Sequence, residues 1–155
     1  MNRERLFRGK RVDNGEWIEG FYAIQSNHAC FQSELKYTSF ILKDECMDWG
    51  LGGLAEYEVI PETVGEFTGL VDKYGNKIFE GDIISATALD TGEEQRAVVC
   101  FGNFIDENND DEYIGFFIEF DGIKTTITQL SIEECKNRIE VIGNVYDNKE
   151  LLEND

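Results

Sequence analysis

The stretch VIPETVGEFTGLVDKYGNKIFEGDII (residues 59–84) decides the fold class, because it places a clear turn between two apolar runs. The runs GEFTGLV and KIF flank DKYGN, in which Gly75 supplies the left-handed residue that a tight turn needs. Gly69 interrupts the first run, which indicates a β-bulge or a close backbone approach. Pro61, the chain's only proline, pre-sets its own φ and favours extended geometry at Ile60. The stretch therefore predicts a β-hairpin.

The same hairpin pattern recurs on both sides of this stretch. Near the N-terminus, DNG separates two runs, and Asn14-Gly15 tolerates the positive φ of a tight turn. Farther along, Asp121-Gly122 fits a two-residue turn between GFFIEF and a returning strand. The predicted strands are LFRGKRV with EWIEGFY, GDIISATAL with QRAVVCFG, GFFIEF with IKTTITQL, and then YTSFILK and IEVIGNVYD.

Helix signals are few. SIEECKNRI opens with Ser131 and carries Glu134 three residues later, a capping box that predicts one short helix near residues 131–138. The terminal NKELLEND predicts a last turn that Asn148 caps and that buries Leu151 and Leu152. The glycine-rich WGLGG predicts a surface loop.

These elements predict an α+β fold that is mostly β. We expect a hairpin-rich N-terminal region over residues 1–65 and a second region over residues 66–155, joined in one compact unit. In the second region, bent strands with a helical turn before the last strand are typical of an SH3-like small β-barrel.

Net charge narrows the classes of partner. The 155 residues include 32 Asp and Glu against 14 Lys and Arg, giving −18 at pH 7. Binding to nucleic acid needs clustered cations for the phosphates, yet the basic RERLFRGKR (residues 3–11) lies beside acids. Direct binding of nucleic acid or of an anionic membrane is therefore disfavoured. The charge predicts solubility, and it also fits a protein partner with a basic surface, or mimicry of DNA. Homo-oligomerisation stays open, because strand edges favour it and the charge opposes it.

The cysteines and the N-terminus predict a cytoplasmic protein. MNRERLFRGK lacks the apolar region of an export signal, and no apolar stretch reaches membrane-spanning length. Cys30, Cys46, Cys100 and Cys135 form no C-x-x-C pair, so reduced, core-filling thiols are expected. A zinc site would need His28, the only histidine, with cysteines whose spacing does not support it.

Two aspartates resemble catalytic groups. Asp82 follows a glycine at a strand start, where its carboxylate can accept hydrogen bonds from turn amides; the alternative is a general base or metal ligand. Asp90 lies in ALDTG, which resembles the active-site loop of aspartic proteases. Glu93 and Glu94 follow where that loop expects a small residue, so an ordinary hairpin turn is favoured.

The acid cluster DENNDDE (residues 106–112) begins like a calcium loop, with Asp106, Asn108 and Asp110 at the first, third and fifth positions. Asp111 stands where the loop requires glycine, and Phe117 stands where it requires glutamate, so an EF-hand is excluded. Weak calcium binding to the cluster stays open on ligand type alone, and a role limited to solubility is the alternative.

Three segments together resemble the YopX family of phage and prophage proteins: LFRGKRVDNGEWIEGFY, the stretch 59–84 and IEVIGNVYDNKELL. The segment 85–113 matches no pattern of that family. The resemblance implies a phage-type protein acting inside a bacterial host, with an SH3-like barrel and with no established reaction, cofactor or catalytic residue. We therefore expect no catalytic, cofactor-binding or metal-binding residues. The expected function is a non-enzymatic acidic protein-interaction module; the alternatives are a DNA mimic that inhibits a DNA-binding protein, and a carboxylate-dependent hydrolase.

Overall fold

The computed structural model of the chain describes residues 5–27, 36–46, 52–87, 92–106, 111–120, 122–127 and 137–153. The chain divides into two compact units, Met1–Glu66 and Phe67–Asp155. Both units consist mainly of antiparallel strands, so the predicted β-rich fold is confirmed. In the part of the chain that the structure describes, no helix has both the length and the apolarity needed to cross a lipid bilayer.

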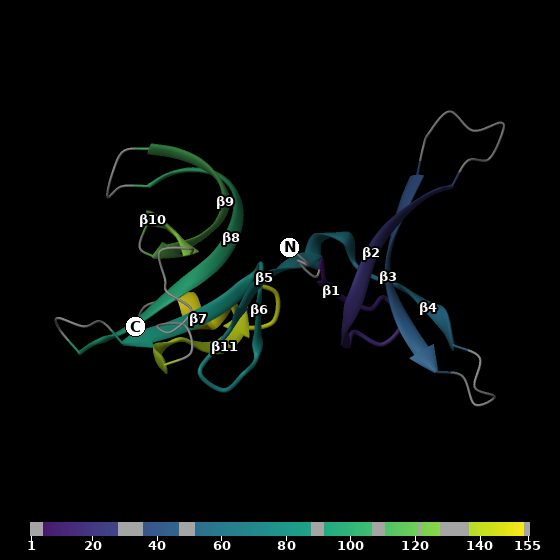
Figure 1. Ribbon diagram of the computed structural model, residues 1–155, viewed down its shortest axis with the longest axis horizontal. Coiled ribbons are helices and arrows are strands. Elements are labelled where there is room, and N and C mark those ends of the chain that lie inside the picture. Colours follow the sequence, from purple (N-terminus) through teal and green to yellow (C-terminus); the bar gives the residue numbers. More distant parts are fainter. Residues whose placement is uncertain are drawn as a thin grey trace. The chain divides into compact units, whose positions relative to one another are not determined.

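The first unit is an antiparallel sheet with the strand order β4-β3-β2-β1, drawn in purple to blue in Figure 1. The predicted hairpin around DNG and the strand at YTSFILK are both present. The loop predicted at WGLGG is partly wrong, because Gly52 and Gly53 begin the edge strand β4. The elements are β1 (Phe7–Lys10), β2 (Trp17–Asn27), β3 (Lys36–Cys46), β4 (Gly52–Glu58) and the 3-10 helix η1 (Pro61–Thr63).

Strand β2 changes partner at Gly20. Its residues up to Gly20 pair with β1, and its residues from Phe21 onward pair with β3. The crossing is tight: a Cβ at Gly20 would lie 2.2 Å from the carbonyl oxygen of Leu42 and 2.8 Å from Cγ2 of Ile41. Because a Cβ does not fit between Gly20 and Leu42, only glycine allows β2 to pass here from pairing with β1 to pairing with β3.

The core of the first unit lies on one face of its sheet. Ile18, Ile41 and Val59 are buried there, and Phe7 and Tyr22 pack against them. Because side chains alternate between the two faces of a strand, the residues next to these point to the opposite face. Among the described residues of this unit, the buried cluster lies on this one face.

The boundary between the units falls within β5, whose first two residues pair with β1 and whose later residues pair with β6. The main sheet of the second unit has the order β10-β9-β8-β7-β11, coloured teal to yellow in Figure 1. The elements are β5 (Gly65–Val71), β6 (Lys77–Phe79), β7 (Asp82–Thr87), β8 (Glu94–Asp106), β9 (Asp111–Phe120), β10 (Ile123–Thr126), β11 (Glu140–Asn144) and the 3-10 helix η3 (Lys149–Leu152).

The stretch 59–84 adopts the predicted local structure. Ile60 is extended and Pro61 opens η1. The register between β5 and β6 shifts between Phe67 and Val71, around Gly69, whose φ is 89°. Gly75 has a φ of 86° in the β5–β6 turn. The hairpin and its bulge are therefore confirmed, and local backbone geometry accounts for both.

The core of the second unit joins strands that are far apart in the sequence. Phe116, Ile118 and Phe120 of β9 pack at its margin. The β7–β8 and β9–β10 hairpins and strand β11 that surround it were all predicted from turn signals and apolar runs. Its buried residues are Ile78, Ile84, Ala97, Val99, Ile127 and Ile139.

Three finer predictions for the second unit fare differently. The SH3-like barrel is not confirmed, because the described strands form an open sheet whose outer strands β10 and β11 each pair on one side only. Of the helix predicted near 131–138, residues 131–136 lie outside the described residues, and residues 137 and 138 are helical. The predicted last turn is present as η3, and Asn148 occupies its N-cap position. Its side chain makes no cap hydrogen bond to η3 and instead accepts the Asn144 N–H at 3.3 Å, while Leu152 stays 38% exposed.

Candidate functional site: an acidic cleft in the second unit

Asp82 lies in the interior of the second unit and supports a turn. Its side chain is 0% exposed, and Oδ2 accepts the N–H of Phe79 at 2.8 Å. The predicted acceptor role toward turn amides is thus confirmed at this amide. Since no part of Asp82 reaches the surface, its carboxylate cannot contact a substrate in this structure.

The residues of the acid cluster differ in burial along the β8–β9 hairpin. Asp106 is 0% exposed, and its Oδ2 accepts the N–H of Thr126 at 3.3 Å. Asp111 stands opposite Asp106 in the register and is exposed, and residues 107–110 lie outside the described residues. Within the described ranges, no three His, Cys, Asp or Glu side chains are grouped so that they could hold a metal ion.

Several other candidates fall where the structure gives no description. Asp90, His28, Cys30 and Cys135 lie outside the described residues, as does the side chain of Cys46. Cys100 is described, and burial, followed by the charges of Glu119 and Glu80, raises the pKa of its thiol to about 11. The thiol of Cys100 is therefore protonated at neutral pH, which makes it a poor nucleophile.

Asp72 is a buried carboxylate whose role no sequence motif indicates. It is 1% exposed, and its Oδ1 accepts the N–H groups of Tyr74 and Asn76 at 2.9 and 2.8 Å. Its Oδ2 accepts the side-chain amide of Asn76 and, across 69 residues of sequence, the N–H of Val141, each at 3.1 Å. Burial raises the pKa of Asp72, but these hydrogen bonds outweigh it and hold the pKa below its ordinary value. Asp72 therefore joins the β5–β6 turn to β11.

We expect the Asp72 carboxylate to make the free energy of unfolding depend on pH in the acid range. Because its folded-state pKa is lowered, Asp72 stabilises the fold above its unfolded-state pKa of about 3.9, and this contribution is lost as the pH falls through the folded-state pKa. The difference in free energy of unfolding between the wild type and Asp72→Ala should stay constant from about pH 7 to pH 5 and shrink below about pH 4. Urea denaturation at a series of pH values measures it, and a difference that widens on acidification would refute the assignment.

A cleft of about 790 Å³ with a clear chemical character lies beside η3. Its walls come from the start of β8, the end of β9 and η3. Among the described residues its lining is net negative, because one arginine faces four glutamates, and the low-dielectric walls of a cleft focus such a field. The charged lining residues are Glu93, Glu94, Arg96, Glu119 and Glu153.

Apolar surface lies between these charges. Val98 and Phe120 contribute to the cleft from the sheet, and Leu151 and Leu152 contribute from η3. An apolar surface bordered by carboxylates suits a side chain with an aliphatic stem and a cationic head, which are the two parts of lysine and arginine. The cleft is therefore suited to the side chains of a basic protein segment.

The arginine of the cleft holds η3 against β8. Arg96 donates from Nη1 to the carbonyl oxygen of Leu151 at 3.2 Å, and its Nε lies 3.5 Å from Oε1 of Glu94. Glu119 lies 3.9 Å from Nζ of Lys124 at the surface. Exposed ion pairs of this kind contribute about 0–1 kcal/mol, so an incoming cation can replace them at small cost. Glu93 and Glu94 are adjacent in the sequence, but only the tertiary structure adds Glu119 and Glu153 to them.

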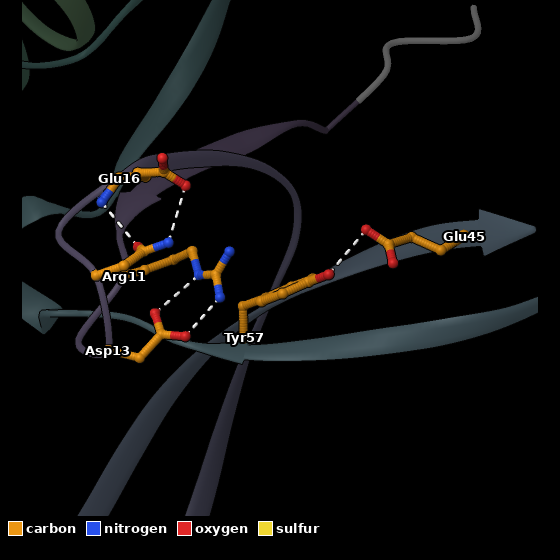
Figure 2. A network of polar contacts seen from close by, with 6 residues as sticks. Arg11, Asp13, Glu16, Glu45 and Tyr57 are labelled. Atoms are coloured by element: carbon orange, nitrogen blue, oxygen red, sulfur yellow. Dashed lines mark hydrogen bonds and ion pairs between the residues drawn. The ribbon is translucent and has the colours of Figure 1, made fainter. Parts of the chain in front are cut away.

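A second polar network, in the first unit, engages Arg11 of the N-terminal basic cluster. Figure 2 shows the guanidinium of Arg11 bound to both carboxylate oxygens of Asp13. Arg11 also lies 4.5 Å from the ring centre of Tyr57, whose hydroxyl donates to Glu45 at 2.8 Å. The hydrogen bond to Glu45, with burial, raises the pKa of Tyr57. The network fastens the β1–β2 turn to β3 and β4, which gives Arg11 a structural role.

Comparison with known proteins places nearly the whole chain in one family. The family model described as YopX protein matches residues 6–153. The chain belongs to the YopX family. The resemblance carried by the three sequence segments is therefore confirmed, and the YopX match extends through both units.

A solved structure supports the fold of this YopX-family chain. The crystal structure of protein EF1440 from Enterococcus faecalis aligns with a TM-score of 0.51 and 23% sequence identity, covering 98% of this chain and 100% of that one. Similarity at this level of identity shows a common fold. No curated protein matches the chain.

Proposed function

We propose that this YopX-family protein is a non-enzymatic, acidic protein-interaction module of phage or prophage origin. It acts in the cytoplasm of the bacterial host and binds a protein with a basic surface. The observation that carries the proposal is the cleft beside η3, where glutamates border apolar surface. Complementary charge speeds encounter and selects the partner, and the apolar part of the cleft holds the stems of the bound cationic side chains.

Arginines of the N-terminal basic cluster already make contacts within the chain, which favours a protein partner over nucleic acid. Arg11 is bound to Asp13 and stacked on Tyr57, and Arg8 lies 4.8 Å from the ring centre of Trp17. Moving either arginine onto a phosphate would require giving up these contacts. A protein partner therefore fits the chain better than nucleic acid does.

Charge reversal in the cleft is expected to weaken partner binding. The partner is first captured from infected or lysogenic host cells at low ionic strength and identified by mass spectrometry. In calorimetric titration, Glu93→Lys with Glu119→Lys should weaken its binding by about tenfold or more, because both substitutions place a cation against cationic side chains. The matched control is Glu62→Lys with Glu112→Lys, which changes the net charge equally at exposed positions outside the cleft.

Two results would refute this proposal: equal weakening by both variants, or affinity that does not fall with added salt. The alternatives have distinct outcomes in the same experiment. A DNA mimic would capture a DNA-binding protein that duplex DNA displaces from the chain. A carboxylate-dependent hydrolase would have to use groups other than Asp82 and Asp106, since both are 0% exposed. Light scattering over a range of salt concentrations tests homo-oligomerisation.

A further inference from the structure

The outer face of β2, β3 and β4 carries apolar side chains that are open to solvent. Phe21 of β2 is 53% exposed and Leu54 of β4 is 58% exposed. The register places Phe21 opposite Leu42, and Ala23 opposite Phe40. Residues directly opposite one another in an antiparallel pair share a face, so these side chains form one patch, here called the outer patch: Phe21, Ala23, Phe40, Leu42 and Leu54.

The outer patch is on the reverse side of the sheet from the core. Ile41 is fully buried and stands opposite Tyr22 and Tyr57, which also pack in the core. Its neighbour Leu42 consequently points to the outer face, because successive side chains in a strand alternate. Sheets with apolar residues on both faces are normally covered on both. An exposed apolar patch bordered by polar residues marks an interaction surface.

The charges bordering the outer patch have one predominant sign. Glu56 stands opposite Leu42, Glu58 opposite Phe40, and Asp44 opposite Leu54, so all three carboxylates lie on the outer face. Each of the three is exposed. Among the described residues, the cations on this face are Lys36 of β3, four residues from Phe40, and Arg8 and Lys10 of β1, of which Arg8 stands opposite Glu19. The complement of this surface is therefore an apolar row flanked by cations.

A second copy of the chain does not have that complement. Pairing two outer patches would bring the carboxylates of β4 near an identical set, and each chain has a net charge of −18. Like charges brought together in this way oppose association. The same carboxylates repel an anionic lipid surface.

We propose that the outer patch docks a protein segment with a row of apolar side chains flanked by lysine or arginine. The apolar row covers Phe21, Leu42 and Leu54, and the cations meet Glu56 and Glu58. This surface uses different residues, in a different unit, from the cleft beside η3, so it stands independently of the proposed function.

The test uses the full chain and two synthetic amphipathic peptides, one with a leucine row flanked by lysines and one with glutamates in place of the lysines. Chemical shifts of the ¹⁵N-labelled chain should change saturably at β2, β3 and β4 with the lysine peptide. Phe21→Ser with Leu54→Ser should weaken this binding by about tenfold or more, because both side chains lose their apolar contact. Ile114→Ser, at a 77% exposed apolar position of β9, is the matched control and should leave it unchanged.

Charge reversal separates specific docking from general attraction to an acidic chain. Glu56→Lys with Glu58→Lys should abolish binding of the lysine peptide at this face and create binding of the glutamate peptide there. The cleft variant Glu93→Lys with Glu119→Lys should bind the lysine peptide at the outer patch as the wild type does. Shifts confined to the cleft, shifts spread over the whole chain, equal binding of both peptides to the wild type, or dimerisation through β2–β4 would each overturn the proposal.

Discussion

Replacing Asp72 by alanine is expected to lower the free energy of unfolding of the second unit by about 3–5 kcal/mol. The carboxylate is 1% exposed and accepts four hydrogen bonds, one of them from Val141 on β11. Alanine leaves these four donors without their acceptor, and each donor that stays buried and unsatisfied costs about 1–3 kcal/mol. Some relaxation of the turn reduces the total, so the costs do not simply add.

Two variants make this expectation specific. Asp72→Asn keeps an acceptor oxygen for part of the network but turns an amide group toward the remaining donors, so its loss should be about half that of alanine. Asp44→Ala removes an exposed carboxylate of β3 and should change stability by less than about 0.5 kcal/mol. Urea unfolding followed by circular dichroism and by amide exchange of β11 measures all three. Equal stability of Asp72→Ala and Asp44→Ala would show that the network does not stabilise the fold.

Replacing Gly20 by alanine should destabilise the first unit by about 3 kcal/mol, at the upper end of the usual cost of overpacking. The added Cβ would lie 2.2 Å from a main-chain oxygen, that of Leu42, so no side-chain rotation can relieve the clash. The backbone of β2 or β3 must shift instead, at the point where β2 leaves β1 for β3. Core residues Ile18 and Ile41 lie beside this point and would be displaced with it.

Tryptophan fluorescence measures this effect in the first unit alone, because Trp17 and Trp49 are the chain's two tryptophans and both belong to that unit. The matched control is Gly52→Ala at the start of β4, where the nearest atom to the added Cβ is Oδ1 of Asp44 at 3.8 Å. That change should stay within about 0.5 kcal/mol. If the two alanine variants unfolded at the same urea concentration, the crossing at Gly20 could not be as tight as the structure has it.

The outer patch and the cleft beside η3 differ in how much of each could be predicted from the sequence. The alternation of Leu54, Glu56 and Glu58 along β4 is visible in the sequence, but its partners on β2 and β3 depend on register. The cleft beside η3 combines residues from positions 93 to 153. Neither surface carries a motif, since shape and charge define both.

What the sequence determined by itself is the set of hairpins. Gly15, Gly75 and Gly122 all have positive φ at the predicted turns, and the runs beside them form the predicted strands. The physical reason is that a tight turn and a two-residue alternation depend on neighbouring residues, whose backbone preferences are local. The bulge at Gly69 and the acceptor role of Asp82 follow from the same local rules.

Tertiary structure alone decided the long-range contacts. The hydrogen bond from Val141 to Asp72, the close crossing at Gly20 and the gathering of glutamates beside η3 each join segments whose approach no local preference specifies. The contacts of Asn148 are likewise decided by packing. Its Oδ1 accepts the N–H of Asn144. The same Oδ1 would lie 2.6 Å from a Cβ on Gly143, so this position requires glycine. Which partner a polar side chain takes depends on the groups that folding brings within hydrogen-bonding distance, and that depends on the packing of the whole unit.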